Sequence, residues 1–125
     1  MEQIADLSKL KLQPLRIPAG WSVDYNASFW EIDPNPSLIP EDERWWVFNE
    51  DMLQMRHAAH DYMLDLGWYP EGDFETGAYR VVLLEHDFLG KEVVCFTTQN
   101  RMELVDKIES LLLQVSDAEL VKNLT

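Results

Sequence analysis

The clearest periodic pattern lies in the last quarter of the chain. Apolar residues recur three or four positions apart, which is the spacing of one helix face: Leu104, Val105, Ile108, Leu111, Leu112 and Val115. Asn100, followed three positions later by Glu103, is typical of a helix start. The same capping pattern recurs from Ser116 to Glu119. A short last helix is expected to follow, with three apolar residues: Leu120, Val121 and Leu124.

Two strands are predicted just before the long helix. Arg80 to Glu85 holds four consecutive apolar residues at its centre, which favours an interior strand covered on each side. His86 to Lys91 contains Gly90 and predicts a turn. Val93 to Thr98 is rich in strand-forming residues and predicts the returning strand.

Alternation of apolar and polar residues predicts two further strands near the start of the chain. Trp21, Val23 and Tyr25 alternate with polar neighbours, and so do Trp30 and Ile32. The dipeptide at positions 26 and 27 would connect these strands in a tight turn, because asparagine tolerates a positive φ.

The stretch from Glu50 to Trp68 carries two competing periodicities. One set of residues has helical spacing, and the set around Leu64, Leu66 and Trp68 alternates as in a strand. We favour a hairpin, and a helix remains the alternative. Asp33 to Glu43, with three prolines, and Trp68 to Gly77, with two glycines, are predicted to be loops.

A run of strands followed by helices predicts an α+β fold, in which an antiparallel meander packs against the C-terminal helix. The 125 residues are expected to form a single domain, 1–125, with enough surface to bury a core.

The negative charge is concentrated in one part of the chain. Residues 24 to 87 hold fifteen Asp and Glu against three Arg, and therefore carry −12 of the net charge of −13. Four of the five tryptophans lie in the same segment. Such a field attracts a basic protein and repels nucleic acid and anionic membranes, so we expect a basic protein partner, with no nucleic-acid and no membrane binding.

Localisation and chemistry follow from what the sequence lacks. The first residues show no basic region followed by an apolar run, and no apolar run is long enough to span a membrane, which indicates a cytoplasmic protein. There is no glycine-rich phosphate loop, no nucleophile elbow and no kinase motif. We therefore expect no enzymatic activity, no catalytic residues and no cofactor.

Two sets of residues are candidates for a metal site or a nucleophile, and each also has a simpler interpretation. His57 and His60 could share a helix face and, with His86, hold a metal; in a hairpin they would instead be solvated turn residues. No metal site is predicted, because the spacing alone is weak. Cys95 lies in an apolar strand, which favours a buried, protonated thiol over a nucleophile.

Two clusters of acids and aromatics are predicted to bind a partner. The first contains Glu41, Asp42, Glu43, Trp45 and Trp46. In an extended strand the two indoles point to opposite faces, so one of them would be exposed unless both faces are covered. An exposed tryptophan beside carboxylates is typical of a binding hot spot. The alternative is that both rings pack inside.

The second cluster follows Trp68 and consists of Glu71, Asp73 and Glu75. Its alternative interpretation is structural, with the aromatic residues closing the sheet edge above a solvated loop.

Two stretches resemble a known group of proteins: Leu12 to Trp21 (LQPLRIPAGW) and Asp65 to Pro70 (DLGWYP). This group consists of small bacterial proteins, and its size and acidity resemble those of the immunity proteins encoded beside polymorphic toxins, including contact-dependent growth inhibition systems. The resemblance implies a non-enzymatic role and brings no site residues with it. The Gly-Trp pairs in both stretches are read as structural, with a turn glycine placing a large ring against the core.

Three hypotheses follow from the sequence. The first is an acidic binding protein that neutralises a basic toxin, with a nuclease as the favoured class, by covering its active site or substrate groove. The second is an adaptor or subunit of a larger cellular assembly. The third is a small metal-dependent hydrolase that uses His57, His60 and His86.

Overall fold

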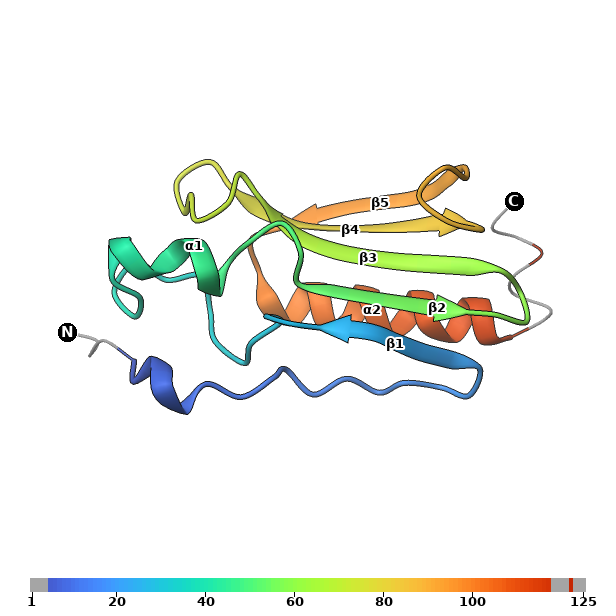
Figure 1. Ribbon diagram of the computed structural model, residues 1–125, viewed down its shortest axis with the longest axis horizontal. Helices are drawn as coiled ribbons and strands as arrows, with labels where there is room; N and C mark the ends of the chain where they lie inside the picture. Colours follow the sequence, from blue (N-terminus) through green and yellow to red (C-terminus); the bar gives the residue numbers. More distant parts are fainter. Residues whose placement is uncertain (1–4, 118–121, 123–125) are drawn as a thin grey trace.

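Five antiparallel strands in chain order form one sheet, and a long helix runs along one of its faces (Figure 1). The structure, a computed structural model, describes residues 5–117 and 122. The strands are β1 (Trp21–Asn26), β2 (Leu53–His57), β3 (Tyr62–Tyr69), β4 (Ala78–Glu85) and β5 (Glu92–Thr98). The predicted α+β fold, a meander packed against a C-terminal helix, is confirmed.

The helix α2 (Arg101–Ser116) supplies one half of the core. Its six predicted apolar positions are all buried: Leu104, Val105, Ile108, Leu111, Leu112 and Val115. The Asn100 side chain accepts a hydrogen bond from the Glu103 backbone N–H at 2.9 Å, so the predicted helix start is confirmed. The short helix expected around Leu120, Val121 and Leu124 lies outside the described residues.

Alternate residues of the strands supply the other half of the core. In β3, Leu64, Leu66 and Trp68 are fully buried in the same cluster as the helix residues, as are Val81 and Leu83 of β4. This side of the sheet is called the inner face. Because side chains alternate along a strand, the residues between them point to the opposite side, which is called the open face.

A second, separate buried cluster lies on the open face and consists of Met63, Val82 and Leu84. β4 lies between β3 and β5, so the predicted interior strand is confirmed. Val82 and Leu84 are buried as expected, yet no residue from outside the sheet belongs to their cluster within the described part of the chain. Long polar side chains provide cover instead: Gln54 Nε2 lies 3.0 Å from the Met63 sulfur.

The hairpin favoured for residues 50 to 68 is confirmed as β2 and β3, with His57 paired to Tyr62 across a short turn. Asp61 in that turn has a φ of 61°, a left-handed conformation that aspartate tolerates better than most residues. The strand periodicity prevails because Leu53, Met55, Leu64 and Leu66 all reach the inner face together.

The strand predicted at Trp30 to Ile32 is wrong. Only an isolated bridge joins Trp30 to Leu12, and β1 pairs with β2 instead. After β1 the backbone bends toward the start of β2, where the N–H groups of Ala27 and Ser28 both donate to the Met52 carbonyl, at 3.0 and 3.3 Å. The dipeptide after β1 lacks the glycine that a two-residue hairpin turn favours.

The segment before β1 runs beside α2. It contains the short 3-10 helix η1 (Leu7–Lys9), and further along the backbone N–H of Arg16 donates to Glu109 at 2.7 Å. The Ser116 hydroxyl donates to the Ala19 carbonyl at 2.8 Å. The segment before β1 is thus hydrogen-bonded to α2 at two points along the helix. Within residues 5–117 and 122, no helix has the length and apolar character needed to cross a membrane.

The helix and sheet interface predicts a contrast between two positions on α2. Ile108 is fully buried, so Ile108→Ala is expected to lower the free energy of unfolding by about 2 to 5 kcal/mol through lost burial and a cavity. Leu113 is 57% exposed, so Leu113→Ala should lower it by less than about 0.5 kcal/mol. Urea denaturation of both variants measures the difference; equal losses would contradict the assigned helix orientation.

Candidate functional site

The two predicted acidic clusters come together at one end of the molecule. The first lies on the 3-10 helix η2 (Glu41–Glu43) and the following short helix α1 (Arg44–Val47), and the second lies on the loop between β3 and β4. The Gly72 N–H donates to the Phe48 carbonyl at 2.9 Å. A Cβ on Gly72 would lie 3.1 Å from the Trp45 backbone nitrogen, so the two segments are in close contact.

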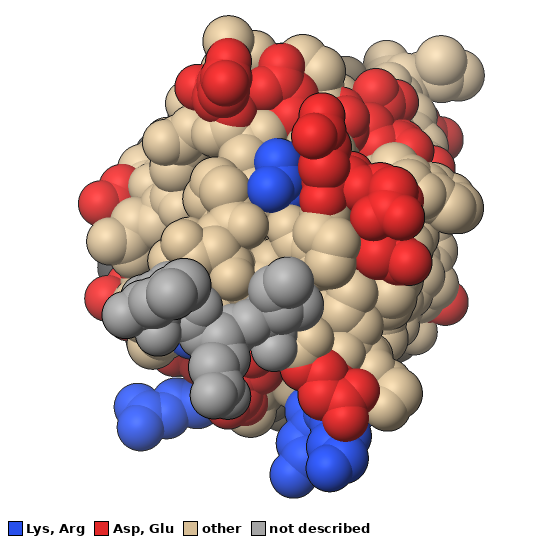
Figure 2. All heavy atoms as spheres, turned by 90° about the vertical axis from the view of Figure 1, so that its left-hand side faces the viewer, with Lys and Arg blue, Asp and Glu red and all other residues tan. Residues whose placement is uncertain are grey.

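Figure 2 shows this end with most of its acidic side chains over the upper half, where uncharged surface and a basic side chain lie among them, and with both basic and acidic groups at its lower margin. We call this surface the acidic end. It consists of the eight predicted residues: Glu41, Asp42, Glu43, Trp45, Trp46, Glu71, Asp73 and Glu75.

An aromatic cluster beneath the acidic end fixes both segments to the sheet. Phe48, directly after α1, lies 5.1 Å from the ring of Trp68 on β3 and 5.1 Å from that of Phe74 in the loop. Trp68 in turn lies 5.0 Å from Tyr79 on β4, with the rings edge to face. The buried Trp68 indole N–H donates to the Asp73 carbonyl at 3.0 Å. The loop between β3 and β4 is thus anchored by both ring packing and a buried hydrogen bond.

Arg44 connects the proline-rich loop to the same cluster. Its Nε donates to the Ile39 carbonyl at 3.0 Å, and its guanidinium carbon lies 4.9 Å from the centroid of the Phe74 ring. A second nitrogen donates to the Pro36 carbonyl at 3.3 Å. The residues from 33 to 43 form an irregular loop as predicted, except that the last three form η2.

Trp45 and Trp46 occupy different environments. The extended conformation assumed for them is wrong: both lie in α1, where consecutive side chains diverge around the helix axis. Trp45 is 60% exposed, whereas Trp46 is half-buried, with its ring 6.3 Å from that of Trp30 and nearly perpendicular to it. One tryptophan of the pair is therefore available at the surface.

The six acids of the acidic end are not equivalent. Glu41, Asp42, Glu71 and Glu75 are exposed. Glu43 accepts a hydrogen bond from the Trp46 indole N–H. The Asp73 carboxylate accepts one from the Thr76 hydroxyl at 2.6 Å and two from backbone N–H groups, and these bonds hold its pKa below the ordinary value. Glu43 and Asp73 therefore shape the two segments, and the other four carboxylates face solvent.

The histidines of the hydrolase hypothesis do not converge on one point. The His57 and His60 rings stack with centroids 4.6 Å apart, but the Nδ1 of His57 accepts from the His60 backbone N–H and that of His60 contacts the Val115 carbonyl. His86 Nδ1 pairs with Asp61 at 2.8 Å. Within the described residues, no group of three or more His, Cys, Asp or Glu side chains is placed to hold a metal.

The expectation that His57 and His60 are solvated turn residues is wrong for His57. His57 is 3% exposed, and its ring lies 5.4 Å from that of Trp21, whose indole N–H donates to the Leu112 carbonyl of α2 at 2.8 Å. The close approach of Gly20 explains this burial, because a Cβ there would lie 2.3 Å from His57 Nε2. Burial, and then the neighbouring His60, lower the pKa of His57.

Cys95 also differs from its expected position. The strand assignment is confirmed, but its side chain is exposed rather than buried, because it points to the open face, opposite Val82. The Arg80 Nε lies 3.4 Å from its sulfur. The apolar neighbours that suggested burial, Val94 and Phe96, point the other way, into the core.

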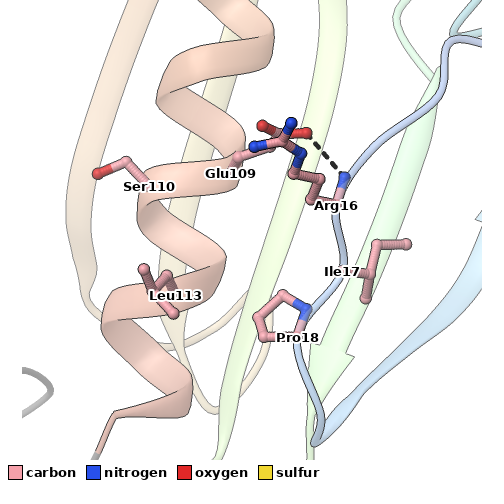
Figure 3. A pocket seen from close by; sticks show the side chains of 6 residues that line it. All are labelled: Arg16, Ile17, Pro18, Glu109, Ser110 and Leu113. Atoms are coloured by element: carbon pink, nitrogen blue, oxygen red, sulfur yellow. Dashed lines mark hydrogen bonds between the residues drawn. The ribbon is translucent and has the colours of Figure 1, made fainter.

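The molecule also has shallow cavities away from the acidic end. One of about 510 Å³ lies between the N-terminal segment and α2, and Figure 3 shows its six lining residues: Arg16, Ile17, Pro18, Glu109, Ser110 and Leu113. Its lining is mainly apolar, and the Glu109 carboxylate is already bonded to the Arg16 backbone. The Ser110 hydroxyl points away from the Glu109 carboxylate in Figure 3, so these two lining residues are not arranged as a nucleophile and its base.

A group missed by the sequence analysis lies on the open face. Asp65 on β3 has one oxygen that is buried and without a hydrogen-bond partner in the described part of the chain. Its surroundings include Tyr25, Asp51 and Tyr69. In the sequence, Asp65 is marked only by its position as a single acid between Leu64 and Leu66, in a strand that is otherwise mostly buried.

No family model, no curated protein and no solved structure matches this chain. Function is therefore inferred from the geometry described above and from the charge distribution.

The histidine environments predict opposite titration behaviour for His57 and His86. The pKa of His57 is lower in the folded chain, so below pH 6.5 the unfolded chain binds a proton more readily than the folded chain does. The contribution of neutral His57 to stability is therefore complete above pH 6.5 and declines as the pH falls. The hydrogen bond to Asp61, and then its charge, raise the pKa of His86. A proton NMR titration of the imidazole signals should therefore show His86 charging first; the reverse order would contradict these environments.

Proposed function

We propose that this chain is a non-enzymatic binding protein that neutralises a basic toxin by covering its active site or substrate groove. A nuclease is the toxin class that the charge favours, since a nuclease has to be basic along the path of its substrate. The protein would act in the cytoplasm, where such a toxin reaches its substrate.

The single observation that carries this proposal is the arrangement of the acidic end. Trp45 is 60% exposed and lies between two acidic segments that are 28 or more positions apart in the chain, counted from Glu43 to Glu71. A large aromatic side chain that loses its water on binding supplies most of the free energy in a typical hot spot. The surrounding carboxylates, Glu41, Asp42, Glu71 and Glu75, would accelerate encounter with a cationic surface.

The rigidity of the acidic end also supports the proposal. The aromatic rings of Phe48, Trp68 and Phe74 hold α1 and the loop in place before any partner arrives. A surface that is ordered in advance loses less conformational entropy on binding, and more of the contact free energy remains as affinity.

Replacing the exposed indole tests the hot-spot role. Trp45→Ala should weaken binding to the toxin domain by about 30-fold or more, since a hot-spot tryptophan contributes about 2 kcal/mol or more. Phe88 is a matched control, because it is 61% exposed and lies in the turn between β4 and β5. Titration calorimetry with the basic toxin domain encoded beside the gene would measure both variants; equal affinity of Trp45→Ala and wild type would contradict the proposal.

Removing charge tests the electrostatic part separately. Glu71→Gln with Glu75→Gln should lower the association rate several-fold at low salt, while the dissociation rate changes little. Glu103→Gln with Asp106→Asn, both exposed on α2, removes the same charge elsewhere and should change the rate less. Stopped-flow measurements over a range of ionic strength would show this; a wild-type rate unaffected by salt would rule out steering.

A further inference from the structure

The open face of the sheet carries a carboxylate that the fold itself does not neutralise. Asp65 lies in the middle of a row that crosses all five strands. The row runs across the sheet through Tyr25, Gln54, Asp65, Val82 and Cys95. One oxygen of Asp65 is buried and accepts no hydrogen bond from any described residue. A buried acceptor without a donor is unfavourable, so this position is poorly explained by the isolated fold.

The segment before β2 encloses one side of Asp65. Gly67 leaves the next position on β3 without a side chain, and the backbone carbonyl of Glu50 lies over it, 2.2 Å from where a Cβ would stand. The Tyr69 hydroxyl donates to this carbonyl at 3.2 Å. Asp51 follows directly and shares a side-chain hydrogen bond with Tyr25. Two carboxylates and two phenol rings are thus grouped on the open face.

The cations of this face are already engaged. Arg56 pairs with Asp24 at 3.8 Å and donates to the His86 carbonyl at 2.8 Å. Arg80 pairs with Glu92 at 3.6 Å, contacts Cys95, and has its guanidinium carbon 6.0 Å from the centroid of the Tyr69 ring. Among the described residues, neither Asp51 nor Asp65 forms an ion pair. The site therefore has an excess of negative charge that a cation from outside would complement.

The electrostatics of Asp65 agree with this geometry. Burial, and then the charge of Asp51, raise its pKa to about 6, while Arg80 acts in the opposite direction. The carboxylate is therefore ionised at neutral pH in a site that disfavours its charge. A bound cation would relieve this unfavourable state and gain binding free energy from it.

We propose that the open face receives an arginine side chain of the basic partner, held between the carboxylates of Asp51 and Asp65 and against the rings of Tyr25 and Tyr69. This inference rests on the proposed function and adds a second contact to that of the acidic end. Arginine is favoured over lysine because its planar guanidinium stacks on aromatic rings and can donate to two carboxylates at once.

The test uses the full chain without any toxin. Isotopically labelled protein is titrated with ethylguanidinium chloride, the end of an arginine side chain, and sodium chloride at equal ionic strength serves as the reference. We expect saturable NMR shifts at the Asp65 and Asp51 carboxyl carbons and at the two tyrosine rings. Asp65→Asn should weaken this binding by about tenfold or more, and Asp42→Asn at the acidic end by less than about twofold.

Two further readouts sharpen the outcome. Binding by the wild type should weaken as the pH falls through 6, because protonation of Asp65 removes the charge that attracts the cation. Asp65→Asn should lack this pH dependence and should fold at least as stably at pH 7, since it removes an unfavourable buried charge. Asp51→Asn, which leaves Asp65 in place, provides the second variant and should also weaken binding.

The inference is overturned if the Asp65 signals respond to ethylguanidinium no more than to sodium, or if Asp65→Asn binds as the wild type does. Stronger binding of ethylammonium would overturn the choice of arginine. These outcomes do not depend on the acidic end, so they are distinguishable from a failure of Trp45→Ala to weaken toxin binding.

Discussion

The structure depends on the packing of one helix against one face of a five-stranded antiparallel sheet. The apolar side of α2 and the inner-face residues of the strands form the main core, and the ladder pairs every strand with its neighbour in chain order. A single helix cannot cover both faces, so the other face has to be compatible with water. Here the amide of Gln54 and the guanidinium of Arg56 both contact the Met63 sulfur, and Arg56 also donates to the His86 carbonyl. Arg56 and Arg80 on the open face are both paired, so Asp65, which has an oxygen without a partner among the described residues, stands out.

The core continues past the helix at the acidic end, where aromatic rings replace helical side chains. Phe48, Trp68, Phe74 and Tyr79 contact one another at centroid distances of 5.0 to 5.8 Å, mostly edge to face. This arrangement allows short, irregular segments to be held as firmly as regular ones, because large rings bury much area at little cost in side-chain entropy. A surface built on such segments can carry an exposed indole and many charges, because the rings beneath it belong to the main core while Trp45 stays at the surface.

The sequence predicts the elements with strong, uninterrupted periodicity. The helix face from Leu104 to Val115 and the interior strand around Val82 are correct because their burial pattern follows from local spacing alone. The region from Trp30 to Ile32 alternates like a strand, but its apolar side chains pack in and against the main core, and β1 finds its partner in β2, some 30 residues further along the chain. Such long-range pairing is invisible to local pattern. For the site, composition indicated the acidic segments, whereas their meeting depends on contacts such as that of Gly72 with the Trp45 backbone. Asp65 was missed because its electrostatic environment is set by residues from three other segments of the chain.

The placement of charge is the last step in connecting this fold to binding. Like charges gathered in one region destabilise the folded chain, and nothing in the packing of the inner face requires them. Some acids are explained by the fold: Asp73 organises its loop, and Asp33 pairs with Arg101 at 2.9 Å. Others, such as Glu71 and Asp65, have no such structural role within the described residues. Repulsion among exposed carboxylates is relieved when a cationic surface approaches, so the unfavourable free energy stored in the unbound protein becomes a driving force for association. This driving force is what the proposed binding of a basic partner would use, both at the exposed tryptophan of the acidic end and at Asp65 on the open face.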